Sequence, residues 1–484
     1  MNNPKPHGAV LLAEQQPASA VLHAVLADTA AAFPLVFNGI ELPVDAKAFR
    51  NTYPDVLPRF EATRLASGER SAIARHAVAV LEHNIIWQDE SGCRPLPEAL
   101  TEPAAPIPLE MHAFGGEPGW QPSLVYRGER WDAARLAELG AEQVRRGLMT
   151  PNAGEALAWV GERVLDEGTL RLSGRKIAVL GGGAEMAPTR FWLEAGADVL
   201  WLDVVPPPEN WLASSDIAGR LYWPAGNVDL LTRPQEVLAT LIAFADGDPL
   251  DLGLYAYAPG QARELRLTST MNALVNALPP DLVGSVTILV SPTTATGLSS
   301  QDLAAMRARR QARPAWEAAL AGLGLLGRGG GSVAVGDAAA TRTVVAIQGA
   351  SYQAAQYLGK VLVAECWAGH GVPGSAAPTP LRVSANTAAI TRTRSLSHPV
   401  FAAAFGGAGA FGVETLAPRQ SRRLNGLLAL RDWLCPEPPI PGSVRVHGGI
   451  HTLPYPLEST LRVAAAIGFA RSPRLLRGLI GRSS

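Results

Sequence analysis

Two side chains capable of proton transfer lie on one helix-like stretch, residues 346–364. Tyr352 begins the stretch, and Lys360 follows it by eight residues. A phenol can donate or accept a proton, and a nearby positive charge lowers its pKa. On a regular helix Lys360 lies about 12 Å along the axis from Tyr352 and is turned from it by about 80°. The two side chains therefore share one site only if Tyr352 precedes the regular part of the helix.

Gln356 occupies the position one helical turn after Tyr352. A glutamine can hydrogen-bond to hydroxyl groups, but it has no charge with which to lower the pKa of a phenol from about 10. Two interpretations remain open. Either Lys360 acts from a shifted position, or Tyr352 and Lys360 are an ordinary helix start and a solvated lysine.

A glycine turn and an acidic residue form a second group. Gly181, Gly182 and Gly183 stand between a predicted strand and a helix, where the backbone can approach a ligand at the helix N-terminus. Asp203 ends the next strand, where a carboxylate accepts hydrogen bonds from a ribose diol and repels a 2′-phosphate. This arrangement predicts NAD(H) rather than NADP(H). Glu185 within the turn would repel a phosphate, so adenosylmethionine, which has none, is an alternative ligand.

Alternating strands and helices must position these residues. Apolar runs that predict strands are separated by helical runs, at residues 176–181, 198–204, 222–231, 251–258 and 285–291. Helices of this length between strands imply right-handed crossovers and a parallel sheet. We therefore expect an α/β fold with a doubly wound parallel sheet of the Rossmann type.

The domain organisation follows from the same pass along the chain. A helix that ends at Gly168 precedes the first of these strands, so we place a boundary near residue 170. Residues 1–170 are expected to form a separate N-terminal domain of unknown role, and residues 171–484 the Rossmann domain. An insertion around residues 299–345, with helices and a hairpin, is expected to serve as a lid or a dimerisation arm.

Over about residues 172–435 the chain resembles the short-chain dehydrogenase/reductase superfamily. The resemblance includes the glycine turn, Asp203, the segment 257–260 after the fourth strand, Ser291, Tyr352 and the segment LRVSANTAAITRT at residues 381–393. The tyrosine-to-lysine gap and the Ala-Pro-Gly turn are similar to those of the enoyl-thioester reductases in that superfamily. The sequence departs from the pattern at Gln356 and at the pair Ala388–Ala389, where proline and glycine are usual.

The resemblance implies a role for each matching residue. Tyr352 would protonate a carbonyl or enolate oxygen, Ser291 would orient that oxygen, and Lys360 or Gln356 would hold the ribose. The remaining cofactor contacts would be Ala258, Gly260 and, at the nicotinamide carboxamide, Thr393. The matching register of residues 381–393 makes adenosylmethionine the weaker choice.

The sequence therefore predicts an NAD(H)-dependent oxidoreductase that acts on a small-molecule carbonyl or enoyl-thioester substrate. The alternative is a catalytically silent Rossmann scaffold or nucleotide sensor, whose N-terminal segment carries the function. Glu185 and Gln356 are the observations behind that alternative.

Composition limits the other function classes. The 42 Lys and Arg residues against 43 Asp and Glu give a net charge of −1, which provides no field to attract nucleic acid. No apolar run approaches the length of a membrane span, so no integral membrane association is expected. Three dispersed cysteines indicate reduced thiols and a cytoplasmic location. Two glycines between His447 and His451 argue against a metal site, and we expect a homo-oligomer.

Overall fold

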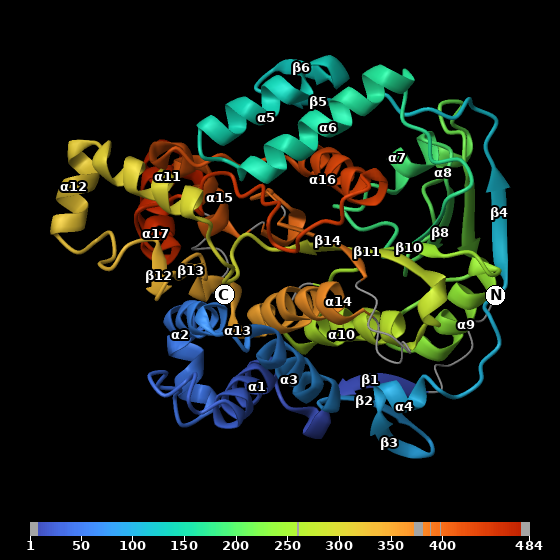
Figure 1. The fold of residues 1–484 in the computed structure, drawn as a ribbon, viewed down its shortest axis with the longest axis horizontal. Coiled ribbons are helices and arrows are strands. Elements are labelled where there is room, and N and C mark those ends of the chain that lie inside the picture. The colour runs from blue at the N-terminus through green and yellow to red at the C-terminus, as the bar shows by residue number, and fades with distance from the viewer. Residues whose placement is uncertain (1–7, 259–260, 372–380, 388, 397, 476–484) are drawn as a thin grey trace.

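The computed structural model describes residues 8–258, 261–371, 381–387, 389–396 and 398–475. Its centre is a seven-stranded sheet in the order β14-β11-β10-β7-β8-β9-β4 (Figure 1). The strands are β4 (Leu109–Ala113), β7 (Lys176–Leu180), β8 (Asp198–Leu202), β9 (Arg220–Pro224), β10 (Leu250–Leu254), β11 (Val283–Val290) and β14 (Arg382–Thr387). All are parallel except β4, which pairs antiparallel with β9. The predicted α/β fold with a parallel sheet is confirmed.

Apolar side chains cover both faces of this sheet. In β7, Ala178 and Leu180 enter one hydrophobic core, whereas Ile177 and Val179 enter the other. Successive side chains of a strand point to opposite faces, and a parallel sheet is normally covered on both. Mainly apolar runs were therefore the correct signal for β7, β8, β10 and β11.

The upper face in Figure 1 is covered by helices from two distant parts of the chain. The connecting helices α7 (Thr189–Glu194) and α8 (Glu209–Leu212) have only six and four residues. A six-residue helix spans about 9 Å, whereas a five-residue strand spans about 17 Å. Three longer helices complete the layer: α5 (Leu136–Arg145), α6 (Pro151–Glu167) and α16 (Pro418–Leu434) (Figure 1).

The lower face carries the helices that connect the later strands. They are α9 (Pro234–Ala245), α10 (Gln261–Ala277) and α14 (Val363–His370). Outside them lie α1 (Ala18–Ala32) and α3 (Arg70–His83), which pack against the same core (Figure 1). This side of the molecule therefore has two helical layers.

The predicted separate N-terminal domain is not seen. Residues 10–107 share one hydrophobic core with the lower face of the sheet, and residues 114–164 share the other core with the upper face. In addition, β4 extends the sheet beyond β9, and at the opposite edge Met149 pairs with Val446. The segment before residue 170 is part of one architecture because the sheet needs it for cover.

The insertion has the predicted composition of helices followed by a hairpin. It contains α11 (Ser300–Gln311), α12 (Ala315–Gly322), β12 (Ser332–Val335) and β13 (Ala338–Thr341). At the same end of the molecule α15 (Pro399–Ala408) packs against α17 (Leu457–Arg471) (Figure 1). The remaining elements include β1 (Gly8–Leu12), α2 (Ala46–Ala66), β2 (Ile85–Asp89), β3 (Gly92–Pro95), α4 (Leu96–Ala99), β5 (Ser123–Tyr126), β6 (Glu129–Asp132) and α13 (Ala350–Gln353).

A buried ionic network fastens α2 to the helical segment that follows Tyr352. Arg64 donates two hydrogen bonds to the carboxylate of Glu61, at 2.8 and 2.9 Å, and lies 3.0 Å from Glu365 of α14. The hydroxyl of Tyr357 donates to the same Glu61 carboxylate at 2.7 Å. Arg64 and Glu61 are each 1% exposed. The buried charges of Arg64 and Glu61 therefore compensate each other.

We predict that Arg64→Met lowers the free energy of unfolding by about 3–5 kcal/mol, because it leaves the buried Glu61 carboxylate without its cation. Urea denaturation of the full chain measures this change. The control Arg462→Met removes an exposed arginine that pairs with Glu458, and it should cost less than about 1 kcal/mol. An equal decrease in the free energy of unfolding for the two variants would show that the buried network stabilises the fold no more than an exposed ion pair does.

Candidate active site at the carboxyl ends of the strands

The segments that leave the parallel strands meet at one edge of the sheet. Between β7 and β10 the chain order reverses, which is where open α/β sheets commonly bind ligands. The structure places most of the predicted site residues at this edge: Gly181, Gly182 and Gly183 after β7, Asp203 after β8, Ala258 after β10, Ser291 after β11 and Thr393 after β14. Gly260 and Ala388 lie outside the described residues.

The glycine turn is required by packing as well as by any ligand. Gly181 has a φ of +93°, and a Cβ atom there would lie 2.3 Å from the amide nitrogen of Ala256. A Cβ on Gly182 would lie 2.4 Å from the indole of Trp201. These glycines let the turn lie against the segments next to it, so their presence alone does not prove a nucleotide site.

Asp203 binds the backbone of the glycine turn. Its Oδ2 accepts the Gly183 N–H at 2.9 Å, and its Oδ1 accepts the Val205 N–H at 3.2 Å. Burial raises the pKa of Asp203, while these N–H groups act in the opposite direction. Because a carboxylate oxygen has two acceptor positions, each oxygen retains the capacity to accept a ribose hydroxyl.

A short loop separates the glycine turn from the helix that follows it. Residues 184–188 separate the turn from α7, which starts at Thr189 and is only six residues long. In this intervening loop, Glu185 accepts the backbone N–H of Arg394 at 3.2 Å. Arg394 directly follows Thr393, so Glu185 connects the glycine turn to the loop that carries the predicted carboxamide contact. The Thr189 hydroxyl, in the first residue of α7, donates to the Gly182 carbonyl at 3.0 Å, so the N-terminus of α7 lies beside the glycine turn.

Tyr352 and Ser291 come together as the resemblance implies. The side chains of Ser291 and Thr293 lie near the hydroxyl of Tyr352 and act to lower its pKa, and the Ser291 and Thr293 hydroxyls are 2.8 Å apart. Burial raises the pKa of Tyr352, and the neighbouring Tyr257 and Glu264 raise it further. The phenol is therefore protonated at neutral pH. Thr293 was not predicted, because an isolated threonine two residues after Ser291 carries no distinguishing signal.

The helix after Tyr352 is wound as a π-helix over Ala354–Leu362, a form with i→i+5 hydrogen bonds that is often found at functional sites. From this segment, the Gln356 Oε1 accepts the Ser291 N–H at 2.9 Å, and the Lys360 Nζ donates to the Leu289 carbonyl at 3.1 Å. Lys360 is 8% exposed. Gln356 thus supports the Ser291 backbone, and Lys360 lies behind it, turned toward β11.

Glu264 is a further site residue that the sequence did not reveal. It lies in the first turn of α10 and is 2% exposed; its Oε2 accepts the Ala258 N–H at 2.9 Å. Burial raises the pKa of Glu264 and lowers that of Lys360, and each charge opposes the shift of the other. A buried acid therefore lies near Tyr352, and Lys360 is the base that compensates it. Acidic residues are common in the first turn of any helix, so the sequence alone did not distinguish Glu264 as a site residue.

His447 and His451 form a stacked pair under the loop after Ser291. Their ring centroids are 4.6 Å apart, and the His451 Nε2 lies 2.9 Å from the Pro292 carbonyl. Burial and the nearby Arg445 lower the pKa of both rings, that of His451 to about 3. Within the described ranges, no group of three or more His, Cys, Asp or Glu side chains is placed to hold a metal ion.

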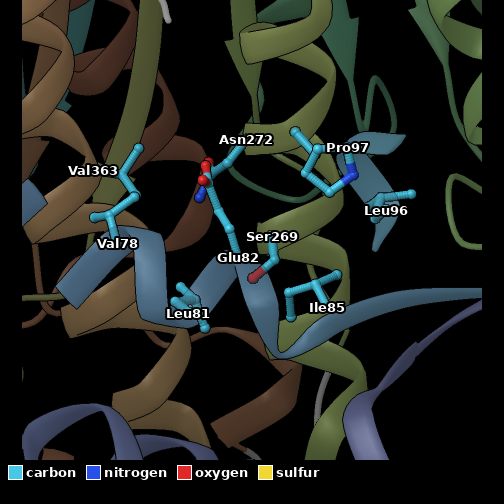
Figure 2. A pocket seen from close by; sticks show the side chains of 10 residues that line it. Val78, Leu81, Glu82, Ile85, Leu96, Pro97, Ser269, Asn272 and Val363 are labelled. Atoms are coloured by element: carbon cyan, nitrogen blue, oxygen red, sulfur yellow. The ribbon is translucent and has the colours of Figure 1, made fainter. Parts of the chain in front are cut away.

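A small apolar pocket lies away from this edge, between α3 and α10. Figure 2 shows Glu82 extending toward Asn272, among Val78, Leu81 and other apolar side chains. Glu82 accepts a hydrogen bond from Asn276 at 2.9 Å, and Asn272 donates to the Gly359 carbonyl in the π-helix at 2.8 Å. The pocket contains none of the predicted site residues.

Comparison with known proteins adds no assignment: no protein-family model matches the chain, and no curated protein matches it significantly. None of the helices in the described part of the chain has the length and apolar composition needed to cross a bilayer. The chemistry of the site is therefore argued from its geometry.

The buried histidines predict an acid-sensitive fold. Unfolding restores the ordinary histidine pKa of about 6.5, so the unfolded chain binds protons below that pH while the folded protein does not. Stability present above pH 6.5 is lost as the pH falls toward 3, by up to about 1.4 kcal/mol per pH unit for each ring. Urea denaturation between pH 6 and 4.5 should therefore give a shallower slope for His451→Gln than for the unchanged protein. The exposed His76→Gln serves as control, and an unchanged slope in both variants would contradict the assignment.

Proposed function

We propose that this protein is an NAD(H)-dependent oxidoreductase that reduces a carbonyl or an enoyl thioester. The observation that carries the proposal is the proximity of Tyr352 and Ser291, at the carboxyl end of β11 and beside the point where the strand order reverses. A phenol and a hydroxyl in this arrangement can bind one substrate oxygen from two directions.

The electrostatics favour reduction over oxidation. Burial raises the pKa of Tyr352, and Lys360 is turned toward the Leu289 carbonyl rather than toward the phenol. A protonated phenol can donate its proton to a substrate oxygen, whereas oxidation of an alcohol needs a phenolate as the base. Ser291 and Thr293 would orient the substrate oxygen, and the same two side chains, which act to lower the pKa of Tyr352, would stabilise the charge left on it.

The residues at the glycine turn fit the adenosine end of the cofactor. Asp203 has acceptor capacity for a ribose diol, and its Oδ2 already binds the N–H of Gly183 in the turn. Thr393 stands in the loop where the resemblance places the carboxamide. Bound NADH would supply the hydride. Glu185 opposes the fit, because its negative charge lies at the same edge.

We predict that Tyr352→Phe lowers turnover by about 100-fold or more while NADH affinity changes little, because only the proton-donating oxygen is removed. The assay is NADH oxidation with a panel of ketones and enoyl thioesters. Tyr222→Phe, on β9, is the matched control and should retain full activity. Turnover that is insensitive to Tyr352→Phe would refute the proposed role.

The cofactor preference rests on Asp203. We predict that the protein binds NADH more tightly than NADPH, and that Asp203→Ala weakens NADH binding by about tenfold and narrows the preference, because the diol loses its acceptor. Calorimetric titration with both cofactors measures this. Tighter binding of NADPH by the unchanged protein would exclude the assigned role of Asp203.

A catalytically silent scaffold or nucleotide sensor is the second candidate. It is favoured by Lys360, which is engaged with β11, and by Glu185, which faces the proposed cofactor site. In that case the protein would bind a nucleotide but show no NADH oxidation with any substrate of the panel. A calorimetric titration with adenosylmethionine, run alongside those with NADH and NADPH, tests the alternative ligand named in the sequence analysis.

A further inference from the structure

Two arginines, Arg394 and Arg422, interact with Glu185 at the edge of the candidate site. Arg394 follows β14, and Arg419, Arg422 and Arg423 lie in the first two turns of α16. Arg423 is engaged elsewhere, since it donates to the Ser123 carbonyl at 2.8 Å. Arg422 is half-buried, and within the described residues its Nε is buried without a hydrogen-bond partner.

The arginines at the start of α16 carry more positive charge than the carboxylates near them compensate. Burial lowers the pKa of Arg422, the charge of Arg419 lowers it further, and Glu185 is the carboxylate that opposes both effects. Burial and the charge of Arg419 likewise lower the pKa of Arg423. A half-buried cation without full compensation is unfavourable, and an anion bound beside it relieves the cost.

Glu185 already makes the contacts that such an anion would make. Its Oε2 accepts the Arg394 N–H at 3.2 Å, and its Oε1 lies 3.9 Å from the Arg394 Nε. A backbone N–H together with guanidinium groups is a common donor set for phosphate oxygens. One carboxylate carries less charge and fewer acceptor atoms than a phosphate group.

We propose that Arg394 and Arg422 form a binding site for a phosphate group, and that Glu185 occupies it as an internal anion until a phosphorylated ligand displaces its carboxylate. The inference rests on the proposed function only in taking the phosphate to be part of a dinucleotide. A separate phosphorylated metabolite has the same chemistry, and the experiment below distinguishes the two sources.

The test is calorimetric titration of the full chain with inorganic pyrophosphate at low ionic strength. We expect Arg422→Gln to weaken binding by about tenfold or more, through the loss of a charge-assisted hydrogen bond. Arg394→Gln should also weaken binding, and because Arg394 is 93% exposed this variant keeps the test valid if Arg422→Gln does not fold. Glu185→Gln should tighten binding. The control Arg462→Gln removes one positive charge on α17, far from Glu185 in the sequence, and should leave the affinity for pyrophosphate unchanged.

The outcomes separate this inference from the proposed function. Pyrophosphate binding that weakens in both arginine variants and tightens in Glu185→Gln supports the phosphate site. If NADH then competes with pyrophosphate, the phosphate belongs to the dinucleotide; if NADH does not bind at all, the site takes another phosphorylated ligand and the proposed function fails. Binding of NADH that ignores pyrophosphate and both arginine variants overturns the phosphate site alone. Failure of the unchanged protein and Glu185→Gln to bind pyrophosphate also overturns it.

Discussion

The need to cover both faces of a parallel sheet determines this structure. The helices that connect β7 to β8 and β8 to β9 are too short to cover the upper face, so α5, α6 and α16 take their place. The segment before residue 170 therefore contributes to both hydrophobic cores and to one edge of the sheet. Its first role is structural, whatever further role it has.

The helices that cover the sheet also hold the candidate site in place. The helical segment that begins at Tyr352 packs between the sheet and the N-terminal helices, and the network of Arg64, Glu61 and Tyr357 fixes it to α2. A side chain within this segment can hold its position against Ser291 only while that packing persists. Loss of the N-terminal helices would thus disturb the chemistry without any change in the residues that perform it.

The charged groups at the site divide into two environments. Glu264 and Lys360 are almost fully buried behind the strand ends and compensate each other. Glu185 and the arginines near α16 lie closer to solvent and are unequal in charge. A buried and balanced pair stabilises one arrangement, whereas an unbalanced exposed group favours the binding of a further anion. One edge of the sheet therefore contains both a compensated buried pair and an uncompensated group close to solvent.

The sequence by itself determined β7, β8, β10 and β11, because each is a mainly apolar run, and it located the glycine turn and Asp203 by their places after two of them; β4 (LEMHA) and β14 (RVSANT) are not apolar runs. The tertiary structure decided which distant groups meet: Ser291 with Tyr352 across the insertion, Glu264 with Lys360, and Glu185 with Arg394. It also decided that residues before 170 complete the sheet. Local patterns follow from the period of a strand or helix, whereas contacts between distant side chains depend on how whole layers pack, which a single sequence does not specify.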